Sequence, residues 1–185
     1  MLVITLRSCV AAAALSVLLP LASIMTASLA SGWFDPLRNA LSDLGHAARS
    51  RVAPIFNWGL STGGLMITLV SAVCFRKYRL LLAAGMATGY SLVLVAVFDE
   101  IYGYLHFVVS VAFFLSLAFT LAAYAASFRT LTPLPALAAG ITAWILHIGY
   151  NIPKGAAIPE LVSILLCAPF YLHAALTCSR VGEYS

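Results

Sequence analysis

Carboxylates and imidazoles are the side chains of this sequence whose types and spacing could do chemistry. Charged residues make up only 9% of the chain, yet the segment WFDPLRNALSDLGH at 33–46 holds acids, an Arg, an Asn, a Ser and a His. More acids and histidines follow at 99–106, 147 and 160. A carboxylate beside a histidine can bind a cation, hold a polar headgroup or activate water. These groups are therefore the first candidates for a functional site.

The elements that position these groups must be membrane helices. Hydrophobic residues make up 63% of the 185 residues, and the mean hydropathy is +1.02. A soluble domain needs a polar surface that so few charged residues cannot supply. Helices satisfy their own backbone hydrogen bonds inside a bilayer. The composition therefore predicts an all-α integral membrane bundle, with 1–185 as a single transmembrane domain. The net charge of +4 does not indicate nucleic-acid binding.

Apolar runs of about twenty residues predict six transmembrane helices. They lie near residues 8–31, 52–75, 80–98, 104–127, 134–151 and 159–178. The RKYR cluster at 76–79 leads a modest excess of Arg and Lys on the side of both termini. We therefore expect a multi-pass protein of the cell membrane with the N-terminus and the C-terminus in the cytoplasm. The first run could also be a signal peptide that ends at SLAS, 28–31, but its length favours a retained helix.

The first outer loop is expected to contain a short amphipathic helix over residues 36–45. Asp35 and Pro36 are typical of an N-cap and a first helical position. Leucines then recur at steps of four and three, which makes one apolar stripe. The opposite, polar side could simply face water. We expect instead that it contributes to a site on the bundle.

Polar residues gather near the outer ends of the predicted helices, where we expect one outward-facing pocket. A charge at the middle of a membrane costs roughly 2.5 to 3.5 kcal/mol on insertion scales, so buried ionisable groups need partners. The candidates are Ser42, Asp43, His46, Asn57, Asp99, Glu100, His106, His147, Lys154 and Glu160. Each has a simpler explanation. Lys154 could extend to the membrane surface, and Glu160 could favour the positive end of its helix.

The four cysteines predict no disulfide framework. Cys9, Cys74 and Cys178 lie near the predicted cytoplasmic ends of helices, and Cys167 lies within a span. Disulfides persist in oxidising compartments, and none of these residues falls in an outer loop. We therefore expect all four to act as small buried hydrophobic residues.

Four segments resemble one known family. They are FDPLRNALSDLGH, APIFNWGLSTGGLMI, YLHFVVSVAFF and IPELVSILL, and the resemblance runs from about Phe34 to Tyr171. They are similar to domain-of-unknown-function family 998 of prokaryotic membrane proteins, and the most specific piece is the SDLG at 42–45. The resemblance implies a small bundle of about six helices. It implies no catalytic role, substrate or cofactor.

Three functions fit these residues. The one we favour is binding or sensing of a lipid headgroup, a cation or a small polar ligand in the outward-facing pocket. The second is a structural or accessory subunit of a larger membrane complex. The third is a membrane-embedded hydrolase in which zinc or another divalent cation activates water. The order of residues matches neither HExxH nor a nucleophile elbow, so a metal is not favoured and enzymatic activity stays undecided. Membrane lipids surround the protein in every case.

Overall fold

The computed structural model describes residues 6–181, and within them the chain is all-helical. The six α-helices are α1 (Leu6–Ser31), α2 (Ala53–Cys74), α3 (Arg79–Val97), α4 (Tyr104–Phe128), α5 (Leu134–Tyr150) and α6 (Ala157–Val181). Two 3₁₀ helices, η1 (Leu41–Gly45) and η2 (Glu100–Tyr102), lie in connections between them. The predicted helical membrane bundle is confirmed, and its helix boundaries lie close to the predicted ones.

Five of the described helices are long and apolar enough to cross a membrane, and α5 is shorter. The long ones are α1, α2, α3, α4 and α6. Helix α5 has 17 residues, about 25 Å at a rise of roughly 1.5 Å per residue. Prolines limit it at both ends, because Pro133 precedes it and the left-handed Asn151 followed by Pro153 ends it. The predicted span at 134–151 is therefore a helix of marginal length.

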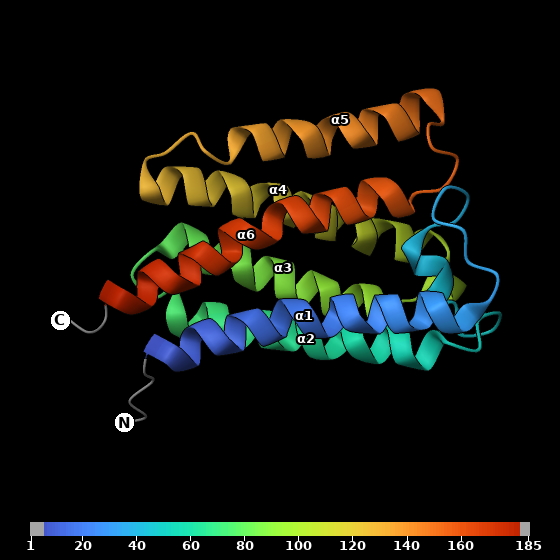
Figure 1. The fold of residues 1–185 in the computed structure, drawn as a ribbon, viewed down its shortest axis with the longest axis horizontal. Coiled ribbons are helices and arrows are strands. Elements are labelled where there is room, and N and C mark those ends of the chain that lie inside the picture. Colours follow the sequence, from blue (N-terminus) through green and yellow to red (C-terminus); the bar gives the residue numbers. More distant parts are fainter. Residues whose placement is uncertain (1–5, 182–185) are drawn as a thin grey trace.

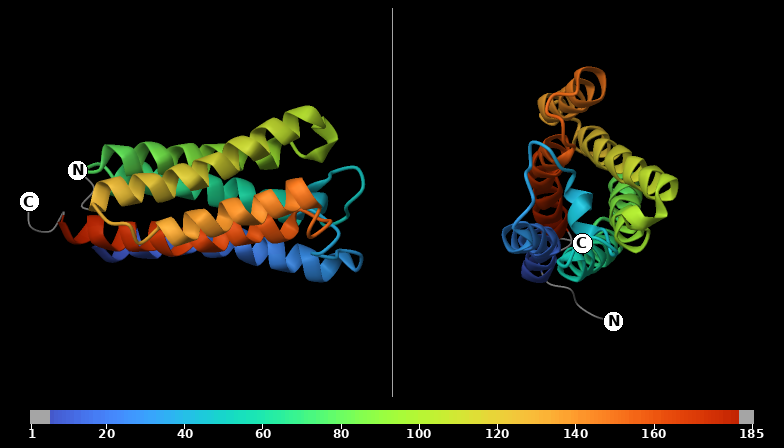
Figure 2. Two further views of the ribbon diagram at one scale, coloured as in Figure 1. Left: turned by 90° about the horizontal axis from the view of Figure 1, so that it is seen from above. Right: turned by 90° about the vertical axis from the view of Figure 1, so that its right-hand side faces the viewer.

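The five long helices form a closed ring, and α5 lies outside it. Neighbours in sequence pack side by side from α1 to α4, and α6 closes the ring by packing against both α4 and α1. Among the α-helices, α5 packs substantially only against α6 and α4. The end-on view shows it standing away from the other helices (Figure 2). None of its residues is buried. The side of α5 that faces away from α4 and α6 is therefore exposed.

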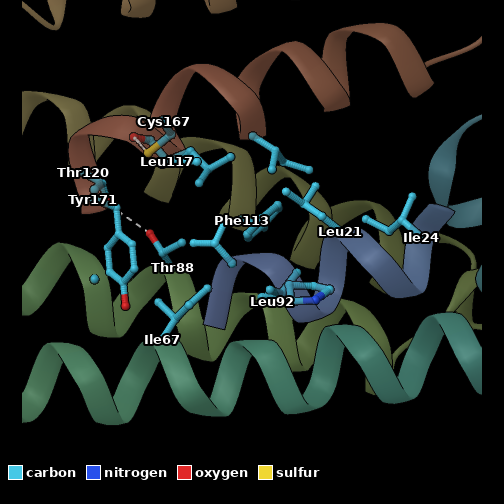
Figure 3. Close-up of a pocket in the computed structure, with 15 residues that line it drawn as sticks. Leu21, Ile24, Ile67, Thr88, Leu92, Phe113, Leu117, Thr120, Cys167 and Tyr171 are labelled. Atoms are coloured by element: carbon cyan, nitrogen blue, oxygen red, sulfur yellow. Dashed lines mark hydrogen bonds between the residues drawn. The ribbon is translucent and has the colours of Figure 1, made fainter. Parts of the chain in front are cut away.

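The interior of the ring is tightly packed and mostly apolar. Gly64 of α2 and Gly89 of α3 lie against each other, and a Cβ atom on Gly64 would come within 2.6 Å of the Gly89 carbonyl oxygen. Such close approach is typical of small residues in membrane helix pairs. A small cavity of about 70 Å³ remains between all five long helices (Figure 3). Its polar groups are already paired, as in the 3.0 Å hydrogen bond between the hydroxyls of Thr88 and Thr120.

The two ends of the bundle differ in structure. Helix α1 begins and α6 ends at the same end, which we call the terminal end (Figure 1). The opposite end, which we call the loop end, carries η1, η2 and the connection between α5 and α6 (Figure 1). The RKYR cluster lies at the terminal end, in the turn between α2 and α3 and the start of α3. The predicted site lies at the loop end.

A disulfide links two helices at the terminal end. Cys9 of α1 is bonded to Cys74 of α2. The prediction that these cysteines are only small hydrophobic residues is therefore wrong, because antiparallel packing of α1 on α2 brings together positions 65 apart in sequence. Cys167 and Cys178 are free and buried, as predicted.

The short helix of the first outer loop is smaller than the predicted range of 36–45. A turn over 36–38 is followed by the 3₁₀ helix η1, which begins at Leu41. In an α-helix the N–H of Leu41 would donate to the carbonyl of Leu37. Here the Leu41 N–H donates to Glu160, and the Leu37 carbonyl accepts from the N–H of Gly155 at 2.9 Å. Partners from the start of α6 and the residues before it thus replace the helical bonds.

Candidate functional site

Two glutamates hold the 3₁₀ helix η1 at the loop end. The backbone N–H of Leu41 donates to Oε2 of Glu160 over 2.6 Å. The hydroxyl of Ser42 donates to Oε1 of Glu100 over 2.9 Å. Glu160 lies in the first turn of α6, and Glu100 begins η2. Consecutive residues of η1 therefore bind carboxylates from two elements that are distant in sequence, which brings these carboxylates into one neighbourhood.

Asp43 adds a third carboxyl group to this neighbourhood. Its Oδ2 accepts from the backbone N–H of Ala40 at 2.9 Å and from the amide of Asn39 at 3.0 Å. Burial is the main cause that raises the pKa of Glu100 above its usual value of 4.5, and the charge and hydrogen bond of Asp43 raise it further. The hydrogen bond from Ser42 acts in the opposite direction and is the strongest cause that lowers this pKa. These surroundings make Glu100 easier to protonate than a carboxyl group in water.

Backbone contacts fix the first loop against the start of α6. The N–H of Gly155 donates to the Leu37 carbonyl at 2.9 Å, and the N–H of Ala157 donates to the Asn39 carbonyl at 3.0 Å. Gly155 is so close to the loop that a Cβ atom there would collide with the backbone of Arg38 and Asn39. The position of η1 over α6 is therefore set by main-chain pairing as well as by Glu160.

His106 lies in the first turn of α4 and is held at both ring nitrogens. Its Nδ1 is 2.7 Å from the Phe98 carbonyl oxygen, and its Nε2 is 3.3 Å from the hydroxyl of Ser110. A carbonyl can only accept, so Nδ1 carries the proton. Asp99 caps η2 by accepting from the Ile101 N–H at 2.8 Å. Because α4 begins only at Tyr104, Asp99 and His106 do not share a helix face.

The two other histidines of the loop end are also oriented by the backbone. Nδ1 of His147, near the end of α5, is 2.9 Å from the Pro153 carbonyl oxygen. Nδ1 of His46 accepts from the N–H of Ala48 at 3.3 Å. The tautomers implied are Nδ1–H for His147 and Nε2–H for the neutral ring of His46.

A cavity of about 1040 Å³ opens between α4, α5 and the loop end, outside the ring of long helices. We call it the lateral cavity. The candidate residues that line it are Ser42, His46, Glu100, His106, His147 and Glu160. Its apolar wall comes from α4 and α5 and consists of Phe107, Val111, Phe114, Leu115, Trp144 and Ile148. One end of the cavity is therefore polar, and the adjoining wall is apolar.

Four of the ten candidate residues do not line the lateral cavity. Asp43 lies behind it and acts on Glu100. Asn57 donates to the Gly45 carbonyl at 2.8 Å, and Asp99 caps η2. Lys154 is exposed. The first three shape the segments around the cavity.

Sequence reasoning missed several residues of the cavity. Ser110 follows His106 by four positions, and Trp144 precedes His147 by three, so each shares a helix face with a histidine. Trp144 donates from Nε1 to the hydroxyl of Ser163 at 3.0 Å, and its ring packs on Phe114 with centroids 4.8 Å apart. Helical spacing from the two histidines was the signal that could have found both residues. Arg49, which also lines the cavity, carries no such signal.

The donor set does not form a metal centre in the described part of the chain. No group of three or more His, Cys, Asp or Glu side chains within it is arranged to hold a metal ion. The imidazole nitrogens and carboxylates are instead engaged with backbone and hydroxyl groups, as in the contact of His106 with Phe98.

Comparison with known protein families identifies a match. A family model described as a protein of unknown function, DUF998, matches residues 10–177. This match confirms the resemblance seen in the sequence. No curated protein and no solved structure matches the chain.

Proposed function

This chain belongs to the DUF998 family of proteins of unknown function, and from that premise we propose that it is a membrane protein that binds a lipid in the lateral cavity. The proposal rests on one observation, which is that polar and apolar side chains line the same cavity. Carboxylates and imidazoles lie at the loop end of the cavity, and apolar side chains of α4 and α5 continue from them. An amphiphile has the same division into a polar head and an apolar chain.

The apolar wall supports entry from the membrane. Phe107, Leu115 and Ile148 line the cavity and are also strongly exposed on the outside of the bundle. Helix α4 is one of the candidate membrane spans, so we expect its exposed Phe107 and Leu115 to face hydrocarbon. An acyl chain can therefore lie along α4 and α5 without leaving the apolar phase, which avoids the free-energy cost of exposing it to water.

The size of the cavity suits a lipid headgroup with the upper part of its chains. Its volume of about 1040 Å³ is just above the roughly 300–1,000 Å³ typical of small-molecule sites. A single ion would leave most of this space unfilled. The polar groups are few and lie at one end, which is the arrangement expected where they orient a ligand and the apolar wall supplies most of the contact area.

Two valines of α4 provide a matched test. Val111 lines the lateral cavity and is 40% exposed, whereas Val108 is 42% exposed and is not among the lining residues. Val111→Trp places a large ring in the cavity, and Val108→Trp places the same ring on the outside of the same helix. We expect Val111→Trp to lower the lipid that copurifies with the protein by about tenfold, a change of roughly 1.4 kcal/mol in binding. Native mass spectrometry in a mild detergent measures it.

The matched control determines how the result is interpreted. Val108→Trp is expected to retain as much lipid as the unmodified chain. Equal lipid retention by both variants and the unmodified chain, with each of them folded by circular dichroism, would contradict the proposal. Loss of lipid in both variants would also contradict it, because the effect would then not depend on the cavity.

We further propose that the terminal end faces the cytoplasm, so that the lateral cavity opens toward the outer leaflet. The support is the positive charge of Arg76, Lys77 and Arg79 at the terminal end. The disulfide between Cys9 and Cys74 at the same end favours the opposite orientation, because disulfides persist in oxidising compartments. A reporter fused to the C-terminus that is active only in the cytoplasm decides between them. Its inactivity would overturn this orientation.

A further inference from the structure

The polar end of the lateral cavity carries more acid than base. Glu100 and Glu160 line it, and Asp43 lies close behind them. Arg49 is the single Lys or Arg among its described lining residues, and it is exposed at the rim. Glu160 is only 7% exposed. The inner part of the polar end therefore presents carboxyl groups, and the positive charge lies toward its mouth.

Backbone groups orient the three histidines of the cavity. Nδ1 of His46 accepts a hydrogen bond from a backbone N–H, which requires an unprotonated nitrogen and hence a neutral ring. His106 and His147 each donate from Nδ1 to a backbone carbonyl, so in the neutral ring Nε2 is an acceptor. With these rings neutral, the polar end offers the carboxylate oxygens of the two glutamates and the two Nε2 atoms as acceptors. A ligand that donates hydrogen bonds and carries positive charge complements it.

A primary ammonium group fits this end better than a metal ion. No set of three metal-binding side chains is present in the described residues. An ammonium group carries three N–H donors and accepts less strict geometry, so it can bind two carboxylates at once. We infer that the lipid bound in the lateral cavity has a headgroup with a primary ammonium, held between Glu100 and Glu160. This inference rests on the proposed function.

The neighbours of the two glutamates support the same ligand. Glu100 and Glu160 bind the consecutive residues Ser42 and Leu41, so their carboxyl groups face one short segment. The rings of Phe114 and Trp144 line the same cavity, and aromatic rings attract a cation placed over their faces. Arg49 at the rim is suited to the phosphate of the same headgroup. Ammonium inside and phosphate at the rim describe an aminophospholipid.

The test compares headgroups that differ only at the nitrogen. Purified full-length protein in mild detergent is titrated with phosphatidylethanolamine, which has three N–H donors, and with phosphatidylcholine, which has none. Glycerophosphoethanolamine, which has no acyl chain, forms a third arm. We expect phosphatidylethanolamine to bind about tenfold more tightly than phosphatidylcholine, the factor for one charge-assisted hydrogen bond. We expect glycerophosphoethanolamine to bind far more weakly, because it lacks the apolar part.

Variants assign the preference to the carboxylates. Glu100→Gln and Glu160→Gln keep an acceptor oxygen for Ser42 and Leu41 but remove the charge. Each is expected to lose the preference for phosphatidylethanolamine while it still binds phosphatidylcholine, which also reports that it is folded. Asp35→Asn removes a carboxylate of the first loop outside the cavity and serves as the matched control. It is expected to keep the preference.

The outcomes separate this inference from the proposed function. Equal binding of the two lipids that Val111→Trp abolishes would overturn the ammonium inference and leave the proposed function standing. Binding of neither lipid, together with tight binding of glycerophosphoethanolamine, would support an ammonium site and overturn the lipid proposal. Binding of none of the three would overturn both.

Discussion

The backbone N–H of Leu41 donates a 2.6 Å hydrogen bond to the carboxylate of Glu160, and this bond joins the first loop to the last helix. Glu160 is buried and also lines the lateral cavity. One carboxylate thus connects the stability of the loop end to the shape of the candidate site. Changes at Glu160 are expected to affect both properties.

Removal of the Glu160 carboxylate is expected to destabilise the loop end. Glu160→Ala leaves the buried N–H of Leu41 without its acceptor, at a cost of about 1 to 3 kcal/mol. Glu160→Gln keeps an oxygen that can accept this bond and is expected to cost less. The measurement is thermal unfolding in detergent, with Asp35→Asn as the control. An unfolding temperature for Glu160→Ala equal to that of Glu160→Gln would show that the bond to Leu41 contributes nothing.

A single methyl group at Gly155 is expected to separate the first loop from α6. Its Cβ atom would collide with the backbone of Arg38 and Asn39, whereas nothing lies within 4 Å of a Cβ atom at Gly149. Gly155→Ala should therefore cost about 1 to 3 kcal/mol, as overpacking does elsewhere. Gly149→Ala should be neutral or slightly stabilising in its helix. Trypsin cleavage after Arg38 and Arg49 reports loop release, and equal cleavage of the two variants would refute the prediction.

Stability should depend on pH through Glu100. Burial raises the pKa of Glu100 above 4.5 in the folded chain, so the folded state binds this proton more tightly than the unfolded state does. The resulting stabilisation is complete below pH 4.5, the usual value, and is lost as the pH rises through the higher folded pKa. Glu100→Gln has no titrating carboxyl group at this position, so its stability does not show this loss. The difference in unfolding temperature between Glu100→Gln and the unmodified chain should therefore move in favour of the variant from pH 4.5 to neutral pH, and a constant difference would contradict this.

The disulfide at the terminal end should be visible by thiol labelling. In denaturant without reductant, an alkylating reagent should modify Cys167 and Cys178 and leave Cys9 and Cys74 unlabelled. Reduction should lower the unfolding free energy by about 2 to 4 kcal/mol, the typical effect of a disulfide. The double variant Cys9→Ser, Cys74→Ser is the control, because reductant should not change its stability. Four labelled cysteines without reductant would show that the bond is absent.

Ser42 and His173 should differ in their effect on lipid binding. Ser42 lines the lateral cavity and donates to Glu100. His173 does not line the cavity, and its Nδ1 lies 2.7 Å from the Tyr124 hydroxyl. Ser42→Ala removes the hydroxyl that donates to Glu100 Oε1 and should weaken retention of phosphatidylethanolamine severalfold. His173→Ala should leave retention unchanged. Native mass spectrometry of both variants checks this, and equal losses would assign the effect to the bundle as a whole.

Local sequence determined where the helices lie. Long apolar runs end at charged or proline-rich turns, such as RKYR at 76–79 and the segment around Pro133. A helix inside a membrane satisfies its hydrogen bonds within its own segment, so these local patterns are enough to place α1 to α6 within a few residues. Composition alone determined the membrane class, because 9% charged residues cannot supply the polar surface of a soluble domain.

Only the tertiary structure decided which of these helices meet and what their ends form. The pairing of Leu41 with Glu160, the disulfide of Cys9 with Cys74 and the exclusion of α5 from the ring each join segments far apart in the chain. No local period encodes such contacts, because they depend on the packing order of whole helices. The conversion of 36–45 into a turn and η1 follows from them, since Gly155 and Glu160 take the hydrogen bonds that a local helix would have made.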